Sequence, residues 1–361
     1  MGYLQYRGAG GYFRWQRWAT YLSMVSLAVT LIVLSLAAAG VLDFHANFDR
    51  LAGAGAYDKV VAEGTAVGAA PVAPFSLAET GKFLLWPAFL LWFPITAVSF
   101  SGEVKDVRRG QLVGMVGAVV AAGIACIALM FLYRAAFGAD FLLSAAAKGV
   151  PLDSPPQVPF FTAIAGGNVL VTVLTGLWVV AIALFVTGAP VLYATRSMLA
   201  WSIDGTAPRR LADVNDRYHS PHWTILVCVA VAEVTLALYA FTDLLGAVSG
   251  FLGQLVSFLV VCAWCAVLPF LRRQTFENSP IVWRIAGIPV LTILGVAATV
   301  FTVPVMYRLW NDTTFSVSLT FLRWGAVIVL AAGFGWFVGW RTYQKRRGVD
   351  ADRRYAEIPI E

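Results

Sequence analysis

Eight long apolar runs divide the chain, and each is long enough to cross a lipid bilayer as a helix. Inside hydrocarbon every backbone polar group has to be bonded within the segment, so such runs fold as helices. With 59% hydrophobic and 13% charged residues, the sequence predicts an all-α polytopic membrane protein and excludes a soluble one. A basic tail, 341–361, follows the predicted crossings, which are 18–40, 82–101, 111–137, 167–203, 223–241, 244–270, 285–306 and 315–340.

The 26 Lys and Arg residues fall mostly in alternate connections between these crossings. Short loops rich in positive charge stay in the cytoplasm, and eight crossings place both termini on one side of the membrane. We therefore expect a multi-pass protein of the cell (plasma) membrane with both termini cytoplasmic. The net charge of +6 follows the loops and forms no nucleic-acid patch, so no nucleic-acid partner is predicted.

Two prolines interrupt the second crossing. Pro87 and Pro94 each lack a backbone N–H, which leaves carbonyls unbonded in a segment that lies in the membrane. Such a break is tolerated where protein or a water-filled cavity surrounds it, which is typical of a transport site. The alternative is a proline kink packed against neighbouring helices. Under the first interpretation the substrate-binding residues are Trp92, Phe93, Pro94, Ile95, Thr96 and Ser99.

Three stretches carry a family resemblance. Residues 102–109, GEVKDVRR, follow the broken helix and resemble the Gly-Glu-Val-Lys-x-x-Arg-Arg signature after the sixth helix of amino acid-polyamine-organocation permeases. Residues 193–221 are similar to the eighth helix and following loop of that superfamily, and 246–273 to its tenth helix. One departure is Ile203, where many members carry Arg before the Asp-Gly pair.

The resemblance implies a fold of two inverted five-helix repeats with substrate held between broken helices one and six. The eight crossings then correspond to helices five to twelve, so we expect an inverted-repeat, transporter-like bundle lacking the first four helices. It also implies a secondary active transporter, a symporter, for amino acids or related organic cations by alternating access. Two alternatives stay open: an incomplete, non-transporting fragment or subunit whose partner supplies the missing helices, and, more remotely, an integral-membrane enzyme.

The charges after the broken helix form a second candidate site. Glu103, Lys105, Arg108 and Arg109 can pair with residues 204–217 as a cytoplasmic gate. The alternative is that they only set the topology, as solvated charges at the headgroups. We predict no enzyme activity, because no loop shows a nucleophile elbow, paired carboxylates, a metal cluster or a phosphate-binding glycine loop.

Two residues inside crossings are candidates for ion coupling. Thr187 occupies the region where sodium-coupled relatives provide a cation ligand, although a helical Thr more often bonds its own backbone. Glu233 is a carboxylate well inside an apolar run, which predicts either a proton relay or a hydrogen-bonded structural Glu. The expected coupling ion is Na⁺ or H⁺, without other cofactors. Cys262 and Cys265 have metal-like spacing, but their apolar helix favours packing.

Overall fold

The computed structural model describes residues 2–69, 75–91, 93–104, 106–152, 157–242, 250–279, 282–311 and 320–348. Within these ranges, eight helical segments are long and apolar enough to cross a membrane. They correspond one for one to the eight predicted crossings, which confirms the all-α polytopic class. Trp92 and Lys105 lie outside the described residues.

The chain divides into two compact units, each with its own core. Unit 1 comprises Met1–Ser76, Pro94–Ala200 and Arg209–Val229. Unit 2 comprises Leu77–Phe93, Trp201–Pro208 and Ala230–Glu361.

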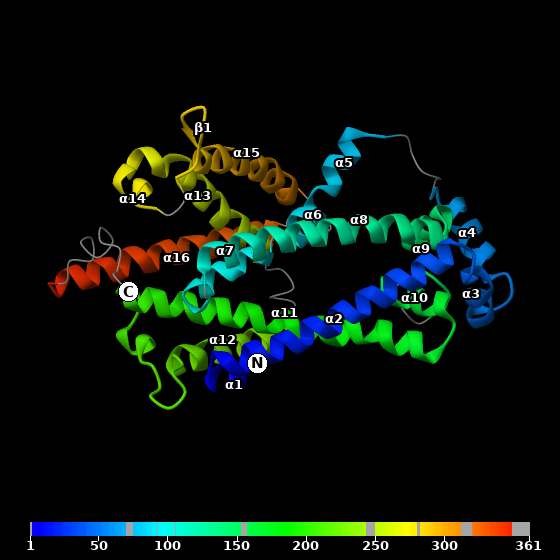
Figure 1. The fold of residues 1–361 in the computed structure, drawn as a ribbon, viewed down its shortest axis with the longest axis horizontal. Helices are drawn as coiled ribbons and strands as arrows, with labels where there is room; N and C mark the ends of the chain where they lie inside the picture. The colour runs from blue at the N-terminus through cyan, green and yellow to red at the C-terminus, as the bar shows by residue number, and fades with distance from the viewer. Residues whose placement is uncertain are drawn as a thin grey trace. The chain divides into compact units, whose positions relative to one another are not determined.

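Two long helices of unit 1, α2 and α8, end beside a group of short helices. Figure 1 shows α3, α4, α9 and α10 gathered where α2 ends and α8 ends. The long helices are α2 (Ala9–Ala38), α8 (Gly117–Phe137), α11 (Val169–Ile203) and the start of α12 (His222–Phe241). The short segments are α1 (Gly2–Tyr6), α3 (Phe44–Ala52), α4 (Ala56–Ala66), α7 (Val107–Gln111), η2 (Leu112–Val116), α9 (Ala139–Lys148), α10 (Val158–Gly166) and η3 (Arg209–Ala212).

The core of unit 1 is a ring cluster of five buried phenylalanines: Phe44, Phe48, Phe137, Phe141 and Phe161. The rings of Phe44 and Phe137 lie 4.3 Å apart between centroids, so the cluster joins α3 to the last turn of α8. Phe161 adds α10 to the same contact at 5.9 Å from Phe44. Offset and edge-to-face ring pairs contribute packing energy beyond the apolar area that they bury.

Short polar contacts shape the chain around the ring cluster. The Asp43 carboxylate accepts a hydrogen bond from Ala46 N at 3.0 Å and so caps the start of α3. Asp49 accepts from Gly55 N at 3.0 Å and from Tyr57 N at 2.8 Å, which turns the chain into α4. The hydrogen bond from Tyr57 is the main reason why the pKa of Asp49 lies below its usual value.

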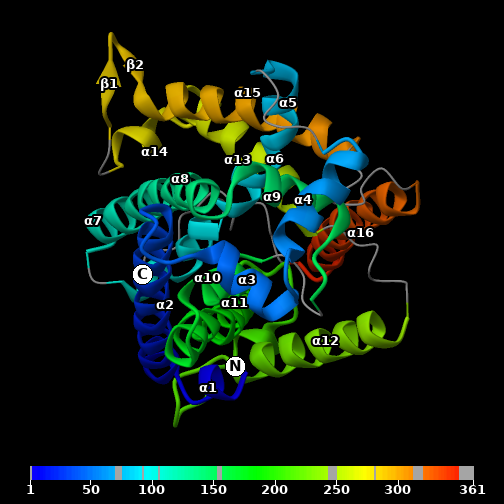
Figure 2. The same ribbon diagram turned by 90° about the vertical axis from the view of Figure 1, so that its right-hand side faces the viewer.

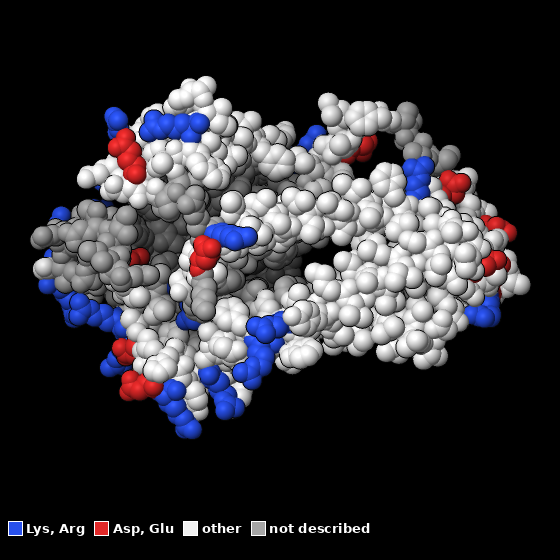
Figure 3. All heavy atoms as spheres, in the orientation of Figure 1, with Lys and Arg blue, Asp and Glu red and all other residues white. Residues whose placement is uncertain are grey.

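The flank of unit 1 along α8 suits a lipid environment. Arg134 is the one charged residue in this helix of 21 residues, and its hydrophobic residues Ile124, Met130 and Phe131 are exposed. Figure 3 shows an uncharged surface along the middle of α8. Exposed apolar side chains in such a band are expected where lipid tails replace water.

Unit 2 packs its helices around a smaller core, formed by Leu85, Phe251, Leu252, Leu255, Val305 and Leu309. Helices α13 and α15 approach so closely that a Cβ on Gly295 would lie 2.5 Å from Ala266 N. The helices are α5 (Leu77–Phe83), α6 (Leu85–Leu90), α13 (Gly250–Leu271), α14 (Arg273–Glu277), α15 (Val290–Trp310) and α16 (Thr320–Arg346).

A two-stranded hairpin leads into α15. Strand β1 (Arg284–Ile285) pairs antiparallel with β2 (Ile288–Pro289), and Figure 2 shows both strands beside the start of α15. Ala286 and Gly287 between them both have positive φ, 48° and 80°, as a type I′ turn requires. The seventh predicted crossing therefore begins at Val290 and not at residue 285.

The prolines among residues 138–165 favour an irregular loop, but α9 and α10 occupy most of this stretch, with Pro159 in the first turn of α10. A first-turn proline is tolerated because its missing N–H would have no helical partner there. Helix α2 begins before residue 18, where the first predicted crossing starts. Hydropathy marks only the apolar part of a helix, and Arg14 and Arg17 are residues that a helix accommodates well.

Candidate functional site

The interrupted crossing consists of three short helical segments. α5 and α6 are α-helical and end at Leu90, after which residues 93–103 form the 3₁₀ helix η1 (Phe93–Glu103). Pro87 lies in the first turn of α6, and Pro94 lies in the first turn of η1. Runs of 3₁₀ helix longer than four residues are uncommon, and within a helix they often mark a hinge. The boundary between the two compact units falls at the same place, between Phe93 and Pro94.

The predicted substrate residues are distributed along this segment. Phe93 packs edge-on against Phe89 at 5.5 Å, and Phe89 packs in the same way against Phe251 of α13 at 5.2 Å. Pro94, Ile95, Thr96 and Ser99 are each half-buried. The Ser99 hydroxyl donates to Thr96 O at 2.8 Å, so its oxygen keeps only acceptor capacity for a ligand.

Gln111 supports the irregular segment and was missed by the sequence analysis. Its amide nitrogen donates to Ala97 O at 3.1 Å and to Ser101 Oγ at 2.6 Å. A side-chain donor at this place bonds a backbone carbonyl of the 3₁₀ segment, as membrane burial requires. Gln111 directly precedes η2, a π-helical turn of the kind frequently found at functional sites. The only signal in the sequence was one polar amide at the head of an apolar crossing.

The four proposed gate residues are only partly described. Arg109 is exposed, and its backbone N–H donates to the Asp106 carboxylate at 3.3 Å. Glu103 and Arg108 have helical backbones, but their side chains lie outside the described part, as does the whole of Lys105. The gate therefore stays a prediction.

The two candidates for ion coupling lie on different helices. Thr187 is within α11, and its side chain is outside the described part. Its neighbour Gly188 accepts a hydrogen bond from the Gln5 amide at 3.1 Å, and Pro190 interrupts the hydrogen-bond ladder just beyond. Glu233 is exposed on α12, and within the described part of the chain it has neither a hydrogen bond nor an ion pair.

Metal-binding chemistry has no support in the described residues. No group of three or more His, Cys, Asp or Glu among them is arranged to hold a metal ion. Cys262 and Cys265 are free thiols on α13, and the first of them is buried where α13 meets α15. That the spacing of the two cysteines serves packing stays a prediction.

A family model for amino acid permeases matches residues 3–332, which is most of the chain. The chain belongs to this family. The permease is accordingly a multi-pass membrane protein that transports amino acids or related small molecules across a lipid bilayer, and its family is one of transporters rather than enzymes. Comparison with curated proteins gave no match, and comparison with solved structures gave none.

Proposed function

We propose that the permease is a secondary active carrier that moves amino acids or related organic cations by alternating access, driven by a Na⁺ or H⁺ gradient. Both termini face the cytoplasm, and the membrane is the plasma membrane. One observation carries the proposal: the crossing is α-helical up to Leu90 and continues from Phe93 as eleven residues of 3₁₀ helix, where the chain passes from one compact unit to the other. Irregular backbone at membrane depth is found where a transporter binds its substrate.

The chemistry of the segment suits a zwitterionic or cationic substrate. Backbone carbonyls and hydroxyl oxygens such as that of Ser99 accept hydrogen bonds from an ammonium group, without a charged side chain. Phe93 and its aromatic neighbours contribute an apolar surface for the substrate side chain. Trp92 belongs to the same proposal through its position in the sequence.

The test of the proposal is gradient-driven uptake by the purified permease in proteoliposomes. We expect a labelled amino acid mixture to accumulate when either Na⁺ or acid is placed outside, and to equilibrate only when neither gradient is present. Uptake without dependence on any imposed gradient would contradict a secondary active mechanism.

Pro94→Ala tests whether the irregular segment matters. With an N–H at this position, residues 93–103 can relax toward an α-helix, which is shorter than a 3₁₀ helix by about 0.5 Å per residue, or roughly 5 Å in all. We expect uptake to fall at least tenfold. Pro87→Ala is the matched control, because Pro87 lies in the first turn of a segment that is already α-helical. Equal uptake in the two variants would exclude a working break at Pro94.

The identity of the coupling ion decides which of two residues is tested for a role in coupling. If Na⁺ drives uptake, Thr187→Ala should raise the Na⁺ concentration required for half-maximal uptake. If H⁺ drives uptake, Glu233→Gln should remove the pH dependence of uptake, and an unchanged pH profile would exclude the relay.

A further inference from the structure

Gln5 is a polar side chain in an unusual place. It lies on α1, a helix of five residues, yet only 4% of its surface is exposed. Burying an amide is costly unless both its nitrogen and its oxygen find partners. The partners of Gln5 therefore indicate why it is buried.

The amide nitrogen of Gln5 holds a carbonyl of α11. It donates to Gly188 O at 3.1 Å, across 183 positions of sequence. The ring of Tyr12, from α2, lies against the same residue, and a Cβ on Gly188 would come within 2.7 Å of Tyr12 Cε2. Two separate side chains therefore converge on Gly188, two residues before the proline that interrupts α11.

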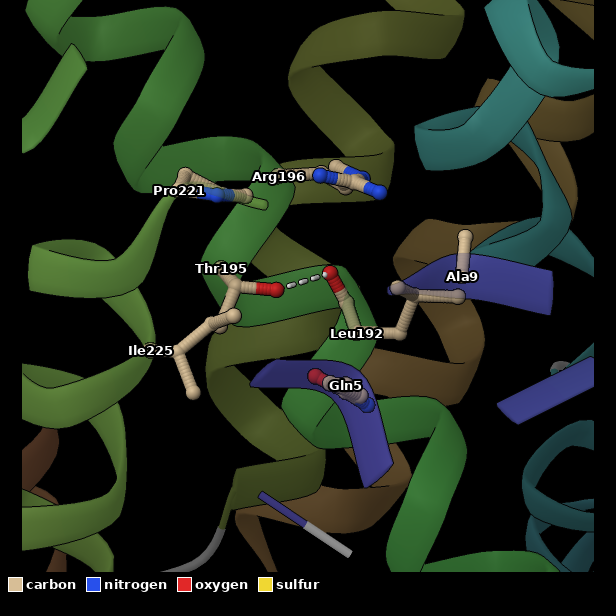
Figure 4. Close-up of a pocket in the computed structure, with 7 residues that line it drawn as sticks. All are labelled: Gln5, Ala9, Leu192, Thr195, Arg196, Pro221 and Ile225. Carbon is tan, nitrogen blue, oxygen red and sulfur yellow. Dashed lines mark hydrogen bonds between the residues drawn. The ribbon is translucent and has the colours of Figure 1, made fainter. Parts of the chain in front are cut away.

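The amide oxygen of Gln5 has no hydrogen-bond partner among the described residues. Gln5 is one of the residues that line a partly open cavity of about 10 Å³, which is space for the centre of one water molecule. Figure 4 shows the Gln5 amide beside Leu192 and Thr195 of α11. The Thr195 hydroxyl donates to Leu192 O at 2.9 Å, so its oxygen is available as an acceptor.

The chemistry of the lining selects the occupant of the cavity. Gln5 Oε1 and Thr195 Oγ1 both accept hydrogen bonds, which suits a ligand with two donors. Arg196 also lines the cavity, and its positive charge disfavours a metal cation or an ammonium group there. A water molecule has two donors, no net charge and the right size.

We propose that Gln5 is a positioning residue for α11, whose amide nitrogen fixes the Gly188 carbonyl beside the interruption while its amide oxygen accepts from one water bound in the cavity. Its effect on transport rests on the proposed function, in which this part of α11 takes part in ion coupling. Its effect on the fold does not depend on that function.

Two other contacts hold α1 in place independently of Gln5. Ser220 Oγ donates to Tyr6 O at 2.7 Å, and Gly2 lies against the Val229 side chain of α12. A substitution at Gln5 therefore changes the contact with Gly188 without releasing the whole segment.

The first experiment uses Gln5→Glu. A protonated carboxyl can donate to Gly188 O and accept from the water, reproducing both bonds, whereas the ionised form cannot donate. Because the Arg196 guanidinium lines the same cavity and would stabilise a charged carboxylate, the pH series is measured in an Arg196→Gln background, with Arg196→Gln alone as its reference. Burial then raises the pKa of the carboxyl in the folded protein above its unfolded value of about 4.3, because the charged form is disfavoured. The destabilisation should be full above the folded pKa and disappear as the pH falls toward 4.3. The measurement is the melting temperature of the purified variant and of its Arg196→Gln reference across this range.

Two variants serve as controls. Tyr3→Glu places the same carboxylate on the exposed face of α1, since Tyr3 is 69% exposed, and should show no recovery at acidic pH. Gln5→Met keeps the length of the side chain without either bond, so its difference from the wild type should not vary with pH. A Gln5→Glu variant that melts like its Arg196→Gln reference at neutral pH, or that shows no recovery on acidification, would overturn the proposal.

Transport gives a second readout. Gln5→Met should lower the maximal uptake rate about threefold to tenfold, the effect of one neutral hydrogen bond, with a smaller change in substrate KM. Gln5→Glu in the Arg196→Gln background should approach the rate of its reference as the pH falls. If the wild type shows no gradient-driven uptake, the proposed function fails, while the melting experiment still decides the role of Gln5.

An engineered disulfide distinguishes two roles for Gln5: positioning of Gly188 and simple anchoring of α1. A Cβ on Gly2 would lie 3.7 Å from Val229 Cβ, which is suitable for a disulfide between Gly2→Cys and Val229→Cys. If Gln5 positions Gly188, oxidation should leave the wild-type rate unchanged and should not restore the Gln5→Met variant. Rescue of Gln5→Met by the cross-link would show that Gln5 only anchors α1, and inhibition of the wild type would show that α1 has to move. Either result would refute the proposal.

Discussion

Replacing Gly295 by Ala should loosen the pair of helices that forms most of unit 2. The added Cβ would lie 2.5 Å from Ala266 N and 2.8 Å from Cys262 O, and both are backbone atoms of α13. Neither can rotate away as a side-chain end would. Ordinary van der Waals contact begins near 3.4 Å, so α13 and α15 have to separate by about 1 Å.

A gap of this size forfeits a quarter to a half of the dispersion energy of the atoms beside it. Overpacked cores typically lose about 1–3 kcal/mol, and alanine returns up to about 1 kcal/mol through its helix propensity. Gly253→Ala on α13 is the matched control, since a Cβ there meets no atom within 4 Å. Relative to that control, we expect Gly295→Ala to be less stable by about 1–3 kcal/mol.

The assay is thermal unfolding in detergent, followed by the fluorescence of the 13 tryptophans. At roughly 2–4 °C per kcal/mol for a domain of this size, Gly295→Ala should melt about 2–12 °C below Gly253→Ala. Equal melting temperatures would mean that α13 and α15 do not meet at Gly295, and the packing described for unit 2 would then be wrong.

Two predictions concern the ring cluster and the α3–α4 turn beside it. Phe44→Ala should cost about 3–5 kcal/mol of stability because Phe44 is 3% exposed, whereas Phe75→Ala, at a site 84% exposed, should have little effect; similar melting temperatures would contradict the cluster. Since the pKa of Asp49 lies below its usual value of 3.8, its ionised form should stabilise the α3–α4 turn above about pH 4 and lose that effect as the pH falls further. The protection factors of the Gly55 and Tyr57 amides, from which the intrinsic pH dependence of hydrogen exchange is divided out, should therefore fall at acidic pH in the wild type, and an Asp49→Asn variant that shows the same fall would refute this account.

The sequence predicted the membrane class because hydrocarbon leaves a chain few choices. A run of apolar residues has to form a helix there whatever its neighbours are, and each of the eight predicted runs has a long apolar helix in the described part of the chain. The family followed from short motifs such as GEVKDVRR, and the match over residues 3–332 confirmed it. The connections were less predictable. Prolines in 138–165 suggested a loop, but Phe141 and Phe161 draw α9 and α10 into the ring cluster, and tertiary packing overrode the local signal.

The candidate site was predictable only as a segment. Prolines marked where the helix could break, but not that a 3₁₀ helix would follow or that Gln111 would bond it, since that bond joins residues 14 positions apart. The role of Gln5 was still less predictable from the sequence. Its position near the start of the chain resembles a loop or lead-in, and its contact with Gly188 depends on three helices that meet only in the folded protein.

The ring cluster also determines how α2 can move. It fixes α2 near Leu34, whereas Tyr12 lies some 33 Å away at about 1.5 Å per residue. A helix held at one end behaves as a lever, so a rotation of about 5° around the cluster displaces Tyr12 by roughly 3 Å. Because the ring of Tyr12 rests on Gly188, such a rotation would reach α11 with an amplitude close to the width of a water molecule.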